Sequence, residues 1–155
     1  MSTDKLKEAK RKAANYCAYQ ERTQQEVRNK LYELGLYKDE VENVLTELIT
    51  ENYVNEERYA KAFAGGKFRV KHWGKMKILH ALKQKNISSY CINRAMEEIP
   101  DDDYVEILYK LIDTKSDTLS GDPFVIKKKI AGYMIGKGFE SELVWSAINE
   151  RLKLN

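Results

Sequence analysis

The segment TQQEVRNKLYELGL (residues 23–36) has the start, the apolar stripe and the end of one complete helix. Thr23 stands three residues before a glutamate, which predicts a capping box at the helix N-terminus. Val27 and Leu31 are one helical turn apart and predict a buried face. Gly35 follows the stripe and predicts a left-handed C-terminal cap.

This apolar pattern occurs three times, with a period of about 51 residues. Seven positions match across the three copies: Val27, Ile78 and Ile130; Leu31, Leu82 and Met134; Gly35, Asn86 and Gly138; Leu36, Ile87 and Phe139; Val41, Ile92 and Val144; Val44, Ala95 and Ala147; Leu45, Met96 and Ile148. The repeat predicts an all-α protein of three tandem three-helix repeats forming an elongated, curved array, with domains at residues 1–54, 55–100 and 101–155. Such arrays offer binding surfaces rather than deep pockets, so we expect the function to lie on a surface.

Apolar spacing and capping residues predict the remaining helices. Their expected ranges are residues 4–20, 38–51, from Asn55 to the basic segment, 75–85, from Ser88 or Ser89 to 99, from Asp101 as the cap, 122–137, and a final helix around residues 143–152. We expect Ile49 on a buried helix face, a weakening or bend at Gly65 and Gly66, and a flexible loop at residues 114–121. Cys17 and Cys91 lie among apolar helical positions and are expected in the core.

The charges are segregated along the chain, although the net charge is only +3. Residues 1–54 carry 9 basic and 10 acidic side chains, residues 55–99 carry 10 and 4, and residues 100–155 carry 8 and 10. Between Glu57 and Glu97 there is no acidic residue in 39 positions. A basic centre between mildly acidic ends predicts a surface that faces a polyanion.

The densest part of this window is KFRVKHWGKMK (residues 67–77), where cations and aromatic residues alternate. The candidate binding residues are Lys67, Arg69, Lys71, Trp73, Lys75 and Lys77. This combination suits a phosphate backbone or another polyanionic assembly. Two roles stay open for Trp73, stacking on a base or partner side chain, or anchoring the core. Lys127, Lys128 and Lys129 either extend the basic track into the third repeat or form a solvated helix face.

Other classes of function find little support. Two cysteines and two histidines provide neither a metal-ligand spacing nor a disulfide framework. There is no phosphate-binding glycine motif and no nucleophile paired with a histidine, so we expect no enzyme, cofactor or metal. The acids at residues 101–103 suit a helix N-terminus better than a metal site. Neither a signal peptide nor a membrane span is apparent, which predicts a cytoplasmic protein without membrane contact.

Two stretches stand out as motifs. The first is the run YCAYQERTQQEVRNKL (residues 16–31), followed by Gly35. The second is the run YVNEERYAKAF (residues 53–63), followed by WGKMKI (residues 73–78) and Leu82. The first resembles the first motif, and the second resembles the most recognisable segment, of the RecX family of regulators of the recombinase RecA. The chain departs from the family pattern at Ala64-Gly65-Gly66, where an Arg-containing run is usual, and near Asn86, where a glycine is common.

The resemblance implies a monomer that binds the RecA–DNA filament, binds DNA weakly on its own, and modulates ATP hydrolysis, strand exchange and coprotease activity, mainly as an inhibitor. It places the protein in homologous recombination, DNA repair and the SOS response. The alternative is a stand-alone helical nucleic-acid-binding module that reads a groove with the helix carrying Lys75, Lys77, His80 and Lys83.

Overall fold

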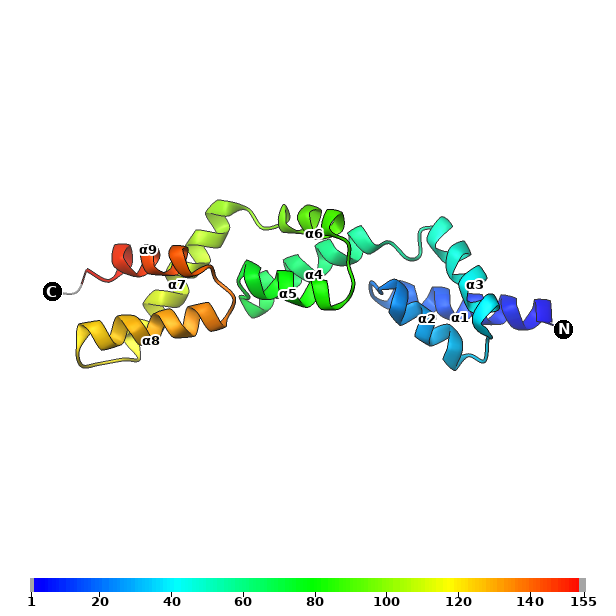
Figure 1. Ribbon diagram of the computed structural model, residues 1–155, viewed down its shortest axis with the longest axis horizontal. Coiled ribbons are helices and arrows are strands. Elements are labelled where there is room, and N and C mark those ends of the chain that lie inside the picture. The colour runs from blue at the N-terminus through cyan, green and yellow to red at the C-terminus, as the bar shows by residue number, and fades with distance from the viewer. Residues whose placement is uncertain (1, 154–155) are drawn as a thin grey trace. The chain divides into compact units, whose positions relative to one another are not determined.

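The computed structural model describes residues 2–153, and within this range the chain is all-α with nine helices and no strand (Figure 1). The helices are α1 (Ser2–Tyr19), α2 (Gln24–Glu33), α3 (Lys38–Thr50), α4 (Glu56–Lys71), α5 (Lys75–Gln84), α6 (Ser89–Met96), α7 (Asp101–Asp117), α8 (Pro123–Gly136) and α9 (Ser141–Arg151). The all-α prediction is confirmed. The chain divides into two compact units, Met1–Ala62 and Phe63–Asn155, so the boundary between them lies within α4. The domain boundaries at residues 54 and 100 stay a prediction.

The first unit has its own core, formed where α1, α2 and α3 pack together. The predicted capping box is present: the Thr23 hydroxyl accepts from the Glu26 amide at 3.0 Å, and the Glu26 carboxylate accepts from the Thr23 amide at 2.8 Å. Val27 and Leu31 are fully buried. The cap fixes where α2 begins, and the buried face fixes which side of α2 turns inward.

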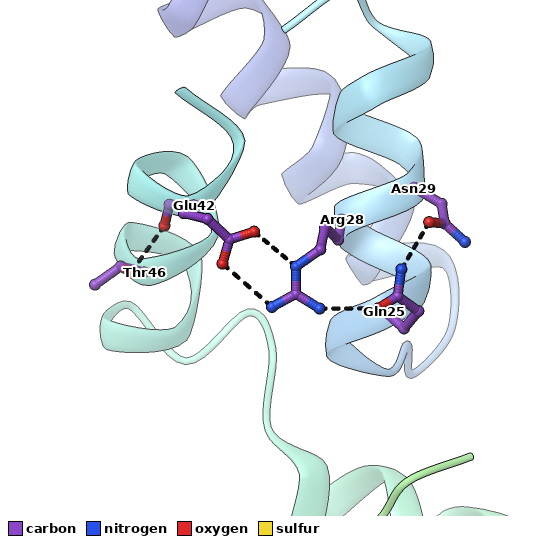
Figure 2. A network of polar contacts seen from close by, with 5 residues as sticks. All are labelled: Gln25, Arg28, Asn29, Glu42 and Thr46. Carbon is purple, nitrogen blue, oxygen red and sulfur yellow. Dashed lines mark hydrogen bonds and ion pairs between the residues drawn. The ribbon is translucent and has the colours of Figure 1, made fainter. Parts of the chain in front are cut away.

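A polar network on the surface joins α2 to α3 in the same unit (Figure 2). The Arg28 guanidinium donates to both carboxylate oxygens of Glu42, with Nε at 2.7 Å and Nη2 at 3.3 Å. Arg28 also donates to the Gln25 side chain at 3.0 Å, and Gln25 donates to Asn29 at 2.8 Å. The hydrogen bond from Arg28 lowers the pKa of Glu42 below its ordinary value.

The repeat found in the sequence is present in the packing. The positions of Val27, Leu31 and Val41 are buried in all three copies, and the left-handed position is occupied by Gly35 (φ 92°), Asn86 (φ 61°) and Gly138 (φ 104°). Each of α2, α5 and α8 ends with the same 3.2 Å hydrogen bond of a Schellman motif, from Leu36 to Leu31, Ile87 to Leu82 and Phe139 to Met134. The apolar residue that follows the turn is buried every time, so the sequence columns mark equivalent positions.

In the second unit, the start of α5 lies directly against the turn that follows α8. The Gly74 amide donates to the Lys137 carbonyl at 2.8 Å, and the Met76 amide donates to the Gly138 carbonyl at 2.9 Å. A Cβ added to Gly74 would lie 2.2 Å from the carbonyl carbon of Gly138. Only a residue without a side chain allows the two backbones to approach this closely.

Tyr104 of α7 also contacts both the start of α5 and the start of α9. Its ring is 2 % exposed and packs between Phe68 and Phe139, with ring centroids 5.8 and 5.1 Å away. Its hydroxyl accepts from the Lys75 amide at 2.8 Å and donates to the Glu140 carboxylate. Burial, together with the hydrogen bond to Glu140, raises the pKa of Tyr104 far above its ordinary value. One buried phenol therefore ties α5, α7 and the start of α9 together.

Several local expectations were wrong. Gly65 and Gly66 do not interrupt α4, which runs without a break from Glu56 to Lys71 and buries Ala64 and Phe68 on either side of them. The loop expected at residues 114–121 begins later, since α7 continues to Asp117 and Lys115 packs over the Tyr133 ring at 4.4 Å.

The remaining corrections concern burial and one cap. Pro100 holds the N-cap position of α7, and Asp101 is the first helical residue. Ile49 is 38 % exposed, because it lies at the edge of the apolar stripe of α3. Cys17 is buried as expected, and burial raises the pKa of its thiol, whereas Cys91 is only partly buried, near the start of the short helix α6. Met96 is likewise only half-buried.

Candidate polyanion-binding surface

Two aromatic rings form the base of the candidate site, one from α4 and one from the connection between α4 and α5. Phe63 and Trp73 meet edge to face, with centroids 6.3 Å apart and an interplanar angle of 75°. His72 adopts a left-handed conformation (φ 56°) after the last residue of α4, and the Trp73 amide then donates back to the Lys67 carbonyl at 3.1 Å. This turn brings Trp73 back beside α4, where the neighbouring side chains can contact it.

Three lysine ammonium groups lie over these two rings. Lys67 Nζ is 4.8 Å from the centroid of Trp73 and 5.5 Å from that of Phe63. Lys77 Nζ is 4.4 Å from Trp73, and Lys85 Nζ is 5.8 Å from Phe63. We call Phe63, Lys67, Trp73, Lys77 and Lys85 the lysine–aromatic cluster. Each contact of this kind contributes about 0.5–1 kcal/mol at an exposed position, which offsets part of the repulsion between the ammonium groups.

These three lysines have no acidic partner within residues 2–153. The aromatic rings orient the ammonium groups without neutralising them, because a ring supplies a quadrupole rather than a net charge. Charges that gather without counter-charges produce a positive local potential. The cluster can therefore accept an anionic partner without first breaking an ion pair.

The other three predicted residues lie apart from the cluster. Arg69 is exposed, and its guanidinium lies across Gly65, where a Cβ would be 2.5 Å from one of its nitrogens. Lys71 is exposed at the end of α4, and its carbonyl accepts from Lys137 Nζ at 3.3 Å. Arg69 also lines a shallow pocket of about 240 Å³ together with Phe68, Asp103, Glu106, Ile107 and Lys110.

Lys75 is already engaged within the fold. Its ammonium group lies 3.4 Å from the Asp101 carboxylate and 4.7 Å from the centroid of the Tyr104 ring. Its backbone amide donates to the Tyr104 hydroxyl. The six predicted residues thus separate into Lys67, Trp73 and Lys77, which come together, and Arg69, Lys71 and Lys75, which do not.

Sequence reasoning missed two members of the cluster, Phe63 and Lys85. Phe63 precedes Lys67 by four residues, and that spacing places both on one face of a continuous helix. The expected bend at Gly65 hid this relationship. Lys85 follows Lys77 by eight residues at the end of α5, so it projects from the same side of that helix.

The described residues provide neither a metal-binding cluster nor a membrane-spanning helix. No group of three or more His, Cys, Asp or Glu side chains between residues 2 and 153 could hold a metal ion. Over the same residues, no helix combines the length and the apolar character needed to cross a membrane.

Comparison with known proteins decides the family. Three models of the RecX three-helix domains match the chain in order: the first domain at residues 9–48, the second at residues 55–96 and the third at residues 101–148. The chain belongs to the RecX family. RecX proteins are regulatory proteins, so this chain is a regulator rather than an enzyme.

Relatives and solved structures agree with this assignment. The regulatory protein RecX of Prosthecochloris aestuarii is 28 % identical over 152 residues, which cover 98 % of this chain and 99 % of that protein. The RecX of Bacillus cytotoxicus is 25 % identical over 148 residues, and this RecX chain spans only 55 % of its length. The crystal structure of RecX from Lactobacillus salivarius matches the fold with a TM-score of 0.88 at 24 % identity, covering 98 % of this chain and 99 % of that one.

Proposed function

We propose that this RecX chain binds the RecA–DNA filament and lowers its activity, namely ATP hydrolysis, strand exchange and coprotease function, in recombination and DNA repair. Membership of the RecX family supports RecA as the partner. The observation that carries the proposal is the convergence of Lys67, Lys77 and Lys85, which have no acidic partner among the described residues. A filament of protein and DNA is polyanionic, and this is the surface on the chain best suited to meet it.

The lysine–aromatic cluster suits charge recognition better than base recognition. Trp73 is half-buried against Phe63, and two ammonium groups already lie over its ring. A base that stacked on Trp73 would have to displace them. The ammonium groups, in contrast, can contact phosphate or carboxylate oxygens without rearrangement, so we expect little dependence on DNA sequence.

The test adds the purified chain, at fewer than one molecule per RecA, to a preformed filament of RecA, ATP and single-stranded DNA. ATP hydrolysis should fall. Replacing Lys67, Lys77 and Lys85 together by Gln should raise the concentration needed for inhibition by about tenfold or more. The matched control replaces Lys7, Lys38 and Lys153 by Gln, which removes the same charge from exposed positions elsewhere. Equal loss in both variants would show that only net charge matters, and no loss in either would reject the cluster.

A stand-alone nucleic-acid-binding module is the second candidate. It is favoured by one observation: Lys77, His80 and Lys83 are all exposed on α5. Such a module should bind bare duplex tightly, with log K falling by about 0.9 for each phosphate contact per decade of salt. A filament regulator should bind bare DNA weakly. Tight, salt-sensitive binding to bare DNA without any effect on RecA hydrolysis would favour the module.

A further inference from the structure

Helix α8 carries apolar residues on its exposed side as well as on its buried side, beside three consecutive lysines. Ile130, Ala131 and Met134 are buried, and α8 packs against α7 and α9, which lie on one side of it in Figure 1. On other positions of the helix, Phe124 is 64 % exposed and Ile135 is 41 % exposed. Neighbouring exposed apolar side chains of this size on one helix often mark an interaction site. Within the described part of the second unit, these two side chains stay exposed to solvent.

Gly132 lies on the same exposed side, at the middle of the helix. Phe124, Lys128, Gly132 and Ile135 follow one another at intervals of four, four and three residues, which places them along one stripe. A Cβ added to Gly132 would meet no atom within 4 Å, and its φ is not positive. A helical glycine costs about 1 kcal/mol relative to alanine, and nothing within the described chain requires it here. Its absent side chain leaves room for another backbone to approach.

We call this stripe the outer face of α8 (Phe124, Val125, Lys128, Gly132 and Ile135); it contains one exposed lysine, and the next residue in sequence, Lys129, is also exposed. Helix α8 has three lysines and no acid. Lys128 Nζ lies 4.6 Å from the centroid of the Phe124 ring. The partner should therefore have an apolar centre and a rim of carboxylates. A second copy of this chain would oppose lysine to lysine, and a phosphate backbone would leave Phe124 and Ile135 without apolar contacts.

We propose that the outer face of α8 docks an acidic amphipathic helix of a protein partner, with Phe124 and Ile135 as anchors and Gly132 as the point of closest approach. This rests on the proposed function, because RecA is then the protein that presents the helix. The chain would contact the filament through two chemically different surfaces. The lysine–aromatic cluster meets a polyanion, and the outer face of α8 meets protein.

The test measures the affinity of the full chain for RecA without DNA, by fluorescence anisotropy of the labelled chain. Replacing Phe124 and Ile135 together by Ser should weaken binding by about tenfold or more, as expected for apolar anchors. Gly132→Leu should weaken it similarly while helical circular dichroism is retained, because leucine favours helix and the space is open. The control replaces Tyr19 and Tyr90, which are 83 % and 66 % exposed, by Ser and should leave the affinity unchanged.

The outcomes separate the two proposals. If the wild-type chain fails to bind RecA in any form, the proposed function falls and the docking proposal falls with it. If it binds RecA and the α8 variants bind equally well, only the docking proposal is overturned. Loss of self-association in the α8 variants would identify a second copy as the occupant. Loss of binding to vesicles of phosphatidylcholine and phosphatidylglycerol would identify a lipid surface. Either result also overturns the proposal.

Discussion

Gly74 and Gly138 are in direct backbone contact, and the amides of Gly74 and Met76 donate into the turn that contains Gly138. The two glycines have different reasons to be glycine. Gly138 adopts a left-handed conformation, whereas Gly74 has an ordinary extended one and is required only by the closeness of its neighbour. Position 74 requires glycine because a side chain would clash with Gly138, and not because its backbone conformation is unusual.

Gly74→Ala should therefore destabilise the second unit by about 2 kcal/mol, within the range seen for overpacked sites. The measurement is the free energy of unfolding in urea. Gly66→Ala is the matched control, because a Cβ there would meet no atom within 4 Å. It lies inside α4 and should stabilise by about 0.5–1 kcal/mol. Equal effects of the two substitutions would contradict the close approach at Gly74.

Tyr104→Phe should remove the hydroxyl that joins Lys75 to Glu140 and cost about 1–2 kcal/mol at neutral pH. Because the folded-state pKa of Tyr104 is raised, the folded chain holds this proton where the unfolded chain loses it. The stability that this provides is full below the unfolded pKa, near 10, and is lost progressively above it. Burial similarly raises the pKa of Tyr59 to about 12, and that residue serves as an internal comparison.

The check on Tyr104 is thermal unfolding of both proteins on either side of about pH 10. Wild type should lose more stability than the Tyr104→Phe variant across this interval. A parallel loss in the two proteins would mean that Tyr104 ionises as freely in the fold as in the unfolded chain.

Glu42→Gln should weaken the tie between α2 and α3 by about 0.5 kcal/mol, a small value because the Glu42 side chain is 46 % exposed. Since the pKa of Glu42 is lowered in the fold, its contribution is present above the ordinary value of 4.5 and is lost as the pH falls through the folded value. Wild type and variant should differ at about pH 7 and converge as the pH falls below the folded value. Glu33→Gln, at an exposed position on α2, is the control and should leave the stability at about pH 7 unchanged.

Leu31→Ala and Leu82→Ala should each cost about 2–5 kcal/mol, because both side chains are fully buried at equivalent positions of two repeats. Urea denaturation followed by circular dichroism measures both. The two residues lie in different compact units, so each substitution should destabilise its own unit. A variant of normal stability would be incompatible with the shared core position.

The core was largely predictable from sequence because the apolar columns repeat and each ends at a residue suited to the left-handed conformation. Val27, Ile78 and Ile130 are all fully buried, as their alignment indicated. Predictions from local helix propensity were wrong where contacts with distant residues stabilise a helix. Two consecutive glycines suggested a bend, but buried Ala64 and Phe68 keep α4 continuous.

The candidate site was only partly predictable for the same reason. The basic window pointed to Lys67 and Lys77, and helical spacing could have added Phe63. The ion pair that engages Lys75 comes from Asp101, which is 26 residues away in the sequence. No local pattern signals such a partner, because it depends on how α7 packs in the second unit.

The shared C-terminal motif of α2, α5 and α8 bears on how the chain evolved. The same hydrogen bond, left-handed residue and buried apolar side chain end each of these helices. The three copies are alike at their buried positions and different at their exposed ones. This is the pattern expected when one repeat is duplicated and the copies then diverge. The buried positions stay alike because each copy needs them to pack its helices, whereas the exposed positions can differ. In this chain the exposed side of α8 carries Phe124 and Ile135 beside its lysines, and the exposed side of α5 carries Lys77, His80 and Lys83.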